Sequence, residues 1–127
     1  MPYEVNCNSK LRIVEATVSG VLSAEEFHSC TDEQMNLTAK HGIGSVLINA
    51  LELTSVELVM DIYDLPGRYE EGGLSRSSRF ALVLPKLRSL HEIVGFYDNV
   101  CNNRGWTVQS FATRDEAIAW LTNNAPS

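Results

Sequence analysis

The stretch FALVLPKLRSLHEIVGFYDNVCNNRGWTVQSF, residues 80–111, decides the fold. It opens with a continuous apolar run closed by Pro85, which is typical of a strand buried on both faces. Apolar residues then recur on one helical face over 90–101, and Gly105 stands where helices commonly end in left-handed backbone. The alternation over 106–111 predicts a second strand. The stretch is therefore a strand–helix–strand unit.

The rest of the chain extends this unit in both directions. Residues 45–50 form another short apolar run, and the alternating segments 3–7 and 11–18 predict an N-terminal hairpin. With the helices between them, the order is β-β-α-β-α-β-α-β-α. Successive strand–helix units need right-handed crossovers. We therefore expect an α/β fold with a mostly parallel sheet, an N-terminal antiparallel hairpin strand, and one domain over 1–127.

Helix starts are predicted by a capping pattern, in which a hydroxyl residue is followed three positions later by Glu. The pattern occurs at Ser23/Glu26, Thr54/Glu57, Ser89/Glu92 and Thr113/Glu116. The first helix, about 24–40, carries one stripe of Phe27, Cys30, Gln34 and Leu37. The second should begin at Thr54 and break near Pro66, and an irregular, exposed and mobile segment should then cover 68–79.

Composition limits the function classes. The chain has 127 residues, 44% of them apolar, and a net charge of −6, which disfavours binding to nucleic acid through phosphate contacts. No apolar run is long enough to span a membrane, and the first residues show no secretory signal pattern. We expect a cytoplasmic protein. The three cysteines, Cys7, Cys30 and Cys101, form no disulfide or zinc pattern and are interpreted as small apolar residues.

Three segments resemble a known fold. ATVSGVLS (16–23), RFALV (79–83) and FATRDEAIAWL (111–121) resemble the second strand, the fourth strand and the ending of the SpoIIAA-like family of the STAS fold. That fold is found in bacterial anti-sigma-factor antagonists, and the resemblance covers nearly the whole chain in order. It implies a non-enzymatic regulatory or protein-interaction module.

The resemblance also implies a candidate phosphorylation switch. The antagonists carry a phosphorylatable Ser in an Asp-Ser-Ser-Gly-like turn after the third strand. Here that connection reads ALELTSVE (50–57), so Thr54 and Ser55 supply hydroxyls while the Asp and Gly are missing. A phosphate on Ser55 would add about −1.5 to −2 charges at a helix N-terminus. In the alternative, Thr54 only caps the helix and Ser55 is solvated.

Two further sites are predicted at or near the same edge of the sheet. Strand ends and helix starts suit an anion at Thr54, Ser55, Lys86, Arg88 and Ser89, with Arg68, Arg76 and Arg79 adding positive charge. The alternative is ordinary solvated charge. An apolar cleft is predicted under the 60–79 segment and lined by Met60, Tyr63, Leu65, Tyr69 and Leu74, which would suit a lipid-like ligand. The same residues could instead pack in the core or form a homodimer face.

No catalytic residue, metal site or cofactor is predicted. The histidines His28, His41 and His91 lack metal-ligand spacing, and no GxSxG, GxGxxG or P-loop motif is present. Two functions are favoured: a module that binds a partner protein, or a carrier of a small lipid-like or anionic ligand. An enzyme is the third alternative, because a Cys–His pair that includes Cys101 or Cys30 could form in space.

Overall fold

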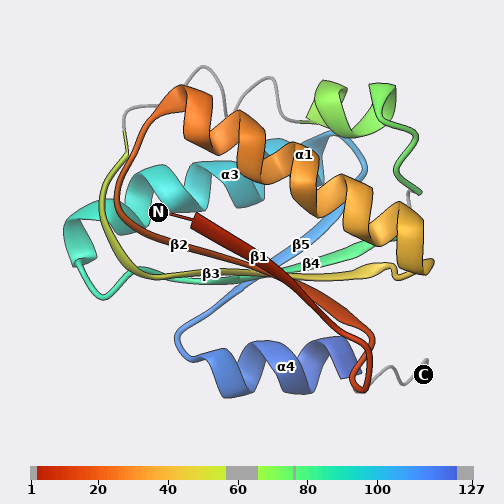
Figure 1. The fold of residues 1–127 in the computed structure, drawn as a ribbon. Helices are drawn as coiled ribbons and strands as arrows, with labels where there is room; N and C mark the ends of the chain where they lie inside the picture. The colour runs from red at the N-terminus through yellow and green to blue at the C-terminus, as the bar shows by residue number, and fades with distance from the viewer. Residues whose placement is uncertain (1–2, 57–65, 76, 123–127) are drawn as a thin grey trace.

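Five strands follow one another across one sheet in the order in which they occur in the chain. The computed structural model describes residues 3–56, 66–75 and 77–122. β1 is antiparallel to β2, and every other neighbouring pair is parallel, which confirms the predicted α/β arrangement (Figure 1). The strands are β1 (Tyr3–Asn8), β2 (Ile13–Leu22), β3 (Ser45–Val56), β4 (Arg79–Val83) and β5 (Thr107–Phe111). The helices are α1 (Ala24–His41), a helical segment at 66–71, the 3₁₀ turn η1 (Arg88–Leu90), α3 (His91–Asn103) and α4 (Arg114–Thr122).

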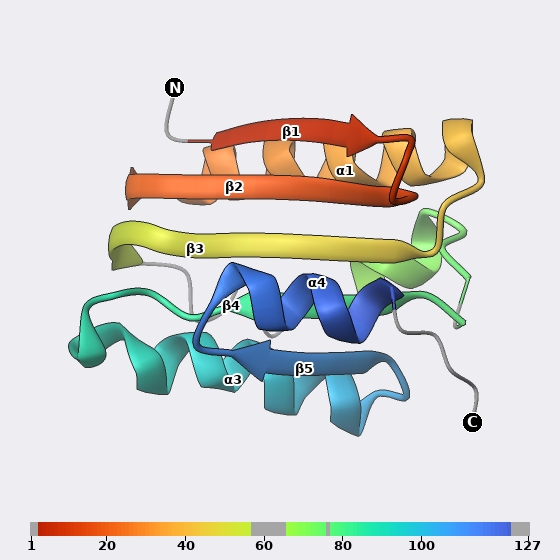
Figure 2. The same ribbon diagram turned by 90° about the horizontal axis from the view of Figure 1, so that it is seen from below.

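The strand order explains how the helices divide between the two faces of the sheet. A right-handed crossover repeated in one direction places every connecting helix on the same side. α1 connects β2 to β3 and α3 connects β4 to β5, and both lie over one face (Figure 1). α4 follows the last strand and packs on the opposite face against β4, β3 and β5 (Figure 2).

β3 extends beyond the apolar run at 45–50 and has 12 residues in all. Its second half pairs with the end of β2, where Val21 lies opposite Ser55, and two register shifts interrupt this ladder. The predicted helix start at Thr54 is therefore wrong. Thr54 and Val56 are β-branched residues, which favour strands. The pairing with β2 also provides hydrogen bonds for backbone N–H and C=O groups that would otherwise be bonded within a helix.

Two of the predicted caps form. The Ser23 hydroxyl accepts from the backbone N–H of Glu26, and the Glu26 carboxylate accepts from the N–H of Ser23, both at 3.1 Å. Thr113 and Glu116 make the same reciprocal pair at 3.2 and 3.3 Å. Ser89 makes no cap, because it lies inside the 3₁₀ turn that precedes α3.

The segment after Pro66 differs from the irregular loop predicted for 68–79. Residues 66–71 are helical, and Tyr69 is only 1% exposed. Its ring stacks on Phe80 with centroids 4.9 Å apart. Burying an aromatic ring stabilises by about 2 kcal/mol, which exceeds the ~1 kcal/mol that a glycine costs in a helix. Tertiary packing therefore outweighs the local signals of a break.

Two apolar cores lie on the two faces of the sheet. The larger one lies between the sheet and the α1 and α3 side, and the smaller one lies under α4 and includes Leu47, Ala81 and Leu121. Within the described residues, no helix is both long and apolar enough to cross a membrane. The larger core contains the cavity described below.

Candidate functional site

The carboxyl ends of β2 and β3 and the loop after β4 meet at one edge of the sheet. We call the surface formed there by Val21, Glu52, Ser55, Lys86 and Leu87 the rim; it lies at the left in Figure 2. The Lys86 Nζ atom lies 2.6 Å from the Glu52 Oε2 atom. The backbone N–H of Lys86 also donates to the carbonyl of Leu51 at 3.1 Å. These contacts fix the loop after β4 against the end of β3.

The two predicted switch hydroxyls lie on this edge in a strand. Thr54 is exposed and Ser55 is half-buried, and both belong to β3. Neither lies in the first turn of a helix, so the helix-dipole argument for a phosphate at Ser55 does not apply to these residues. What the structure provides is a strand hydroxyl, Ser55, at the position that pairs with Val21, whose side chain is exposed.

The cations that the sequence groups together are divided in space. Lys86 is paired with Glu52, and Arg88 is exposed in η1 with Ser89 next to it. Arg68 makes a bidentate contact with Asp32 on α1 at 2.9 and 3.2 Å. Arg79 lies at the opposite end of β4, 4.1 Å above the Trp120 ring, and Arg76 is outside the described residues. Of the predicted cations, Lys86 and Arg88 thus lie near the rim, in the loop and the 3₁₀ turn that follow β4.

Exposed apolar residues are a feature of the rim that sequence reasoning missed. Val21 is 62% exposed and Leu87 is 45% exposed. The third large exposed apolar residue in the described part of the chain, Leu11 at 41%, lies in the β1–β2 turn at the other end of the strands. The sequence could have indicated that Leu87 is exposed, because this residue stands between Lys86 and Arg88 in a segment with no apolar periodicity.

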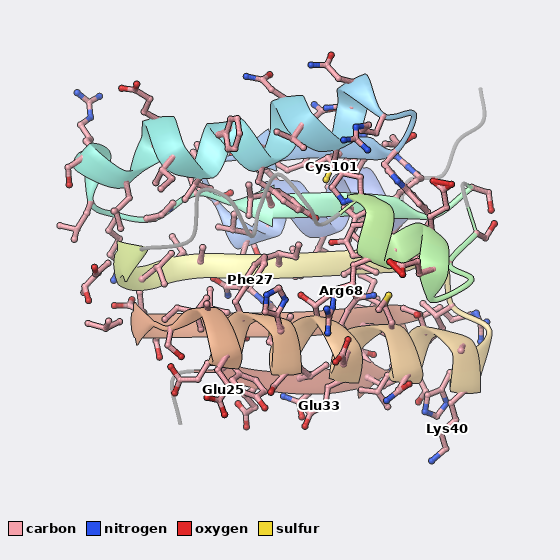
Figure 3. The ribbon with its side chains drawn as sticks, turned by 90° about the horizontal axis from the view of Figure 1, so that it is seen from above. Glu25, Phe27, Glu33, Lys40, Arg68 and Cys101 are labelled. Atoms are coloured by element: carbon pink, nitrogen blue, oxygen red, sulfur yellow. The ribbon has the colours of Figure 1, made fainter. Side chains whose placement is uncertain are left out.

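A cavity of about 80 Å³ lies in the larger core, between the sheet and the helices α1 and α3. Figure 3 looks onto this face and shows α1 and α3 on either side of β3, with Phe27 on the inner side of α1. Small side chains leave the space, among them Ala16 on β2, Ala50 on β3 and Cys30 on α1. The remaining walls include Val18, Leu22, Thr31, Gln34, Ile48, Leu53, Tyr69, Leu82, Val94 and Tyr97.

The predicted cleft residues relate to this cavity in different ways. Tyr69 forms part of its wall. Leu74 is half-buried and packs against the larger core without lining the cavity. Met60, Tyr63 and Leu65 lie outside the described residues. On the α1 side, Phe27, Cys30 and Gln34 belong to the stripe predicted for the first helix and line the cavity. The sequence did not connect this stripe with a cavity, because that depends on how α1 crosses the sheet.

Two buried tyrosine hydroxyls form one polar pair beside the cavity. The Tyr69 and Tyr97 hydroxyl oxygens are 2.9 Å apart. Burial raises the pKa of both tyrosines well above its usual value. Burial also raises the pKa of the Cys101 thiol to about 12, although a hydrogen bond with Tyr97 acts in the opposite direction. Cys30, on the cavity wall, has its pKa raised to about 12 by burial and then by Glu33. These thiols are protonated at neutral pH, unlike nucleophilic cysteines.

Gln34 has a buried side-chain amide nitrogen that makes no hydrogen bond to the described residues. It lies in the stripe predicted for the first helix, lines the cavity, and is only 3% exposed. Its Nε2 atom is buried and has no acceptor among the described residues. Buried amides are normally hydrogen-bonded, because leaving one unpaired costs about 1–3 kcal/mol. The described cavity wall is therefore almost wholly apolar, and the Gln34 nitrogen is buried in the protein without a partner among the described residues.

Metal-ligating residues do not cluster in the part of the chain that the structure describes. No group of three His, Cys, Asp or Glu side chains there is arranged to hold a metal ion. His91 contacts the carbonyl of Pro85 through Nε2 at 2.7 Å, so it fixes the rim loop to the start of α3.

Comparison with solved structures identifies the fold. An anti-sigma factor antagonist from Mycobacterium paratuberculosis matches with a TM-score of 0.63 at 14% identity, covering 94% of this chain and 92% of that one. The anti-sigma factor antagonist SpoIIAA in its unphosphorylated form matches with a TM-score of 0.63 at 15% identity, covering 95% and 98%. An uncharacterised DUF3478-family protein with a SpoIIAA-like fold from Shewanella loihica matches with a TM-score of 0.60 at 16% identity, covering 94% and 91%.

No family model matches the sequence, and no curated protein matches it. The chain has the SpoIIAA-like STAS fold over nearly its whole length, as its sequence resemblance implied.

Proposed function

We propose that this chain is a non-enzymatic regulatory module that binds a partner protein through the rim. The observation that carries the proposal is the gathering of exposed apolar side chains at one edge. Val21 is 62% exposed and pairs with Ser55 near the end of β3, and Leu87 is 45% exposed and follows Lys86, which bonds to Leu51 of the same strand. Protein interfaces combine such an apolar centre with polar surroundings, and Ser55 and the Lys86–Glu52 pair supply the polar groups.

The fold supports this proposal. Two of the matching structures are antagonists of anti-sigma factors, so they are named for an action on another protein. The same fold here presents a hydroxyl, Ser55, at the end of its third strand. Phosphorylation of Ser55 would place a charge of about −1.5 to −2 next to Val21 and oppose an apolar contact there.

The experiment is affinity capture from the parent cell lysate, followed by binding of the identified partner in purified form. Leu87→Glu should abolish capture, because it places a charge in the apolar centre of the rim. Leu11→Glu is the matched control, since Leu11 is exposed to a similar degree but lies at the far end of the strands. Retention of the partner by Leu87→Glu, or equal loss with Leu11→Glu, would contradict a rim interface.

The switch is tested with the same purified partner. Ser55→Asp should weaken binding, whereas Ser55→Ala should preserve it, because only the first introduces charge. Equal affinities for the two variants would remove phosphorylation of Ser55 from the proposal. Sedimentation of the chain with and without its partner would also test the expected homodimer.

A second candidate function, binding of a small apolar ligand, is favoured by the cavity in the larger core. Among the described residues, its wall is apolar apart from Thr31, Gln34 and the tyrosine hydroxyls. Xenon is the simplest probe, because it enters apolar cavities without needing a polar partner. Shifts of NMR signals around Ala16 and Ala50 on exposure to xenon are expected, and unchanged signals would show that the space is not available to a ligand.

A further inference from the structure

We propose that the outer edge of β1 pairs with β1 of a second copy of this chain, so that two five-stranded sheets join into one continuous sheet. This interface differs from the rim, which lies at the carboxyl ends of β2 and β3, so the inference goes beyond the proposed function. It begins from a difference between β5 and β1, the two outer strands of the sheet.

The edge at β5 is partly covered by a side chain. Asn102 donates through Nδ2 to the carbonyl of Val108 at 2.9 Å, and its Oδ1 accepts from the N–H of the same residue at 3.1 Å. The amide of Asn102 thus bonds to Val108 as a neighbouring strand would. Such covering protects the edge of a sheet from pairing with another chain.

The edge at β1 has no such cover. β1 runs in unbroken register with β2, from Tyr3 opposite Val18 to Asn8 opposite Ile13. It contains no proline, lysine or bulge, which are features that commonly prevent edge strands from pairing. In the part of the chain that the structure describes, no side chain bonds to its outer backbone groups. β1 is therefore the edge that is open to a further strand.

Two charges of opposite sign favour a second copy as the occupant of this edge. Glu4 lies near the start of β1 and Lys10 in the turn after it, and both are exposed. Neither forms an ion pair with another described residue. In an antiparallel pair of identical strands, the start of one strand lies beside the end of the other. Glu4 of each copy thus approaches Lys10 of the other, and two equivalent contacts form.

The alternation along β1 selects the register of the pair. Half-buried side chains alternate with exposed ones: Tyr3, Val5 and Cys7 with Glu4, Asn6 and Asn8. A shift by one residue would place the two kinds opposite each other. Centring the pair on Asn6 puts Val5 of each copy opposite Cys7 of the other. Glu4 then lies opposite Asn8, next to the lysine in the turn of the other copy. Centring it on Glu4 or Val5 would bring the two Glu4 carboxylates closer together, where like charges repel.

The helices fit this arrangement. α1 lies over β1 and β2 together (Figure 2). Because neighbouring strands are about 4.8 Å apart, the α1 helices of the two copies would run about 10 Å apart, which is close to the spacing of packed helices. Glu33 lies on the β1 side of α1 (Figure 3), so it would approach Glu33 of the second copy. This like-charge contact should keep the dimer reversible.

Sedimentation equilibrium of the full chain over a range of concentrations tests the proposal, and a reversible dimer is expected. Asn6→Lys should abolish the dimer, because it places like charges at the centre of the pair. Gln109→Lys is the matched control, since Gln109 is exposed on the other outer strand, and it should leave the dimer unchanged. Circular dichroism checks that each variant is folded.

Charge reversal tests the orientation of the two strands. Glu4→Lys should raise the dissociation constant of the dimer about tenfold, because it makes two attractive contacts repulsive. The double variant Glu4→Lys/Lys10→Glu should restore the original value. Glu33→Gln should lower the dissociation constant, and an unchanged value would contradict the approach of the two α1 helices.

Cross-linking of the unaltered chain tests the register. Cys7 of one copy would lie diagonally across from Cys7 of the other, about 7–8 Å away, a distance that a short bis-maleimide bridges. Cys30 and Cys101 are buried, so Cys7 is the accessible thiol, and Cys7→Ser is the control. A dimer that does not cross-link through Cys7 would contradict the pairing centred on Asn6.

Three further outcomes would overturn the proposal: a monomer at every concentration, a dimer that Asn6→Lys leaves intact, or an equal loss of the dimer in Gln109→Lys. Leu87→Glu, the rim variant, should leave the dimer unchanged. Failure of the rim interface and failure of the β1 interface are therefore distinguishable.

Discussion

Tyr69 and Tyr97 bring their hydroxyl oxygens to 2.9 Å from each other inside the larger core, and so join the helical segment 66–71 to α3. Tyr69→Phe should lower the free energy of unfolding by about 1–2 kcal/mol, because it leaves the Tyr97 hydroxyl buried with one partner fewer. Urea denaturation followed by circular dichroism measures the change.

The double variant Tyr69→Phe/Tyr97→Phe is the control for this pair. Replacing both partners removes the unsatisfied group, so the double variant should lose less stability than the sum of the two single variants. Additive losses would show that the two hydroxyls are not energetically coupled.

Alkaline pH should destabilise the protein. Burial raises the pKa of Cys30 and Cys101 to about 12 and the pKa of Tyr69 and Tyr97 well above its usual value. Above pH ~9 the unfolded chain releases these protons while the folded chain retains them, so the free energy of unfolding falls as the pH rises. Urea midpoints from pH 7 to 11 test this, and Tyr69→Phe/Tyr97→Phe should show a shallower fall. A flat profile would contradict the burial of these groups.

An ion pair on the α4 face should contribute in the opposite pH range. Arg114 donates to Glu15 at 2.7 and 2.9 Å, and this hydrogen bonding lowers the pKa of Glu15. A lowered carboxyl pKa adds stability above the usual value of 4.5 that is lost as the pH falls through the folded-state pKa. Arg114→Gln should lower the free energy of unfolding by about 1 kcal/mol at pH 7. This value is modest because Arg114 is partly exposed, and the effect should nearly vanish in acid.

The matched control for Arg114 is a more exposed ion pair that also joins distant segments. Lys86 and Glu52 are both more than half exposed. Lys86→Gln should therefore change the unfolding free energy by less than ~0.5 kcal/mol at either pH. If the two substitutions have equal effects at pH 7, the partial burial of Glu15 contributes nothing.

The two hydroxyl residues Ser23 and Thr54 should differ in their contribution to stability. Ser23→Ala removes a reciprocal helix cap and should cost about 1 kcal/mol. Thr54→Ala changes an exposed strand residue and should alter the unfolding free energy by less than ~0.5 kcal/mol. Thermal unfolding of both variants measures the difference, and an equal loss would favour a helix start at Thr54 after all.

Replacing the unsatisfied amide should stabilise the protein in the absence of ligand. Gln34→Leu should raise the free energy of unfolding by about 1 kcal/mol, because it removes a buried donor that has no partner among the described residues. Thr31→Val is the control, since the Thr31 hydroxyl already bonds to Phe27 and its removal brings no such gain. A loss of stability in Gln34→Leu would indicate that the amide has a structural partner.

Sequence patterns predicted those parts of the fold that depend on local physics. Ser23 and Thr113 cap their helices, and Gly105 takes the left-handed conformation that commonly ends helices. The predicted helix start at Thr54 was wrong because the capping pattern is local. The strand conformation there depends instead on pairing with β2, a segment more than 30 residues earlier in the chain.

The sites were less predictable for the same reason. The sequence placed Thr54, Ser55 and Lys86 on one edge, because parallel strands end together. It did not group Arg79 correctly, since nearness in the chain is not nearness in space: Arg79 begins β4 and Lys86 follows its end. The exposure of Val21 and the isolation of Gln34 Nε2 depend on which helix covers which face, and no local pattern encodes that.

The order β1-β2-β3-β4-β5 has a consequence for biosynthesis. Each strand docks beside the one made just before it, so a nascent chain leaving the ribosome can extend its sheet stepwise without reserving a gap for a later arrival. β1 and β2, which are synthesised first, can therefore act as a template for the rest. Among the described helices, α4 covers the opposite face, and because it follows β5 in the chain, the apolar side chains of that face stay uncovered until all five strands have been made.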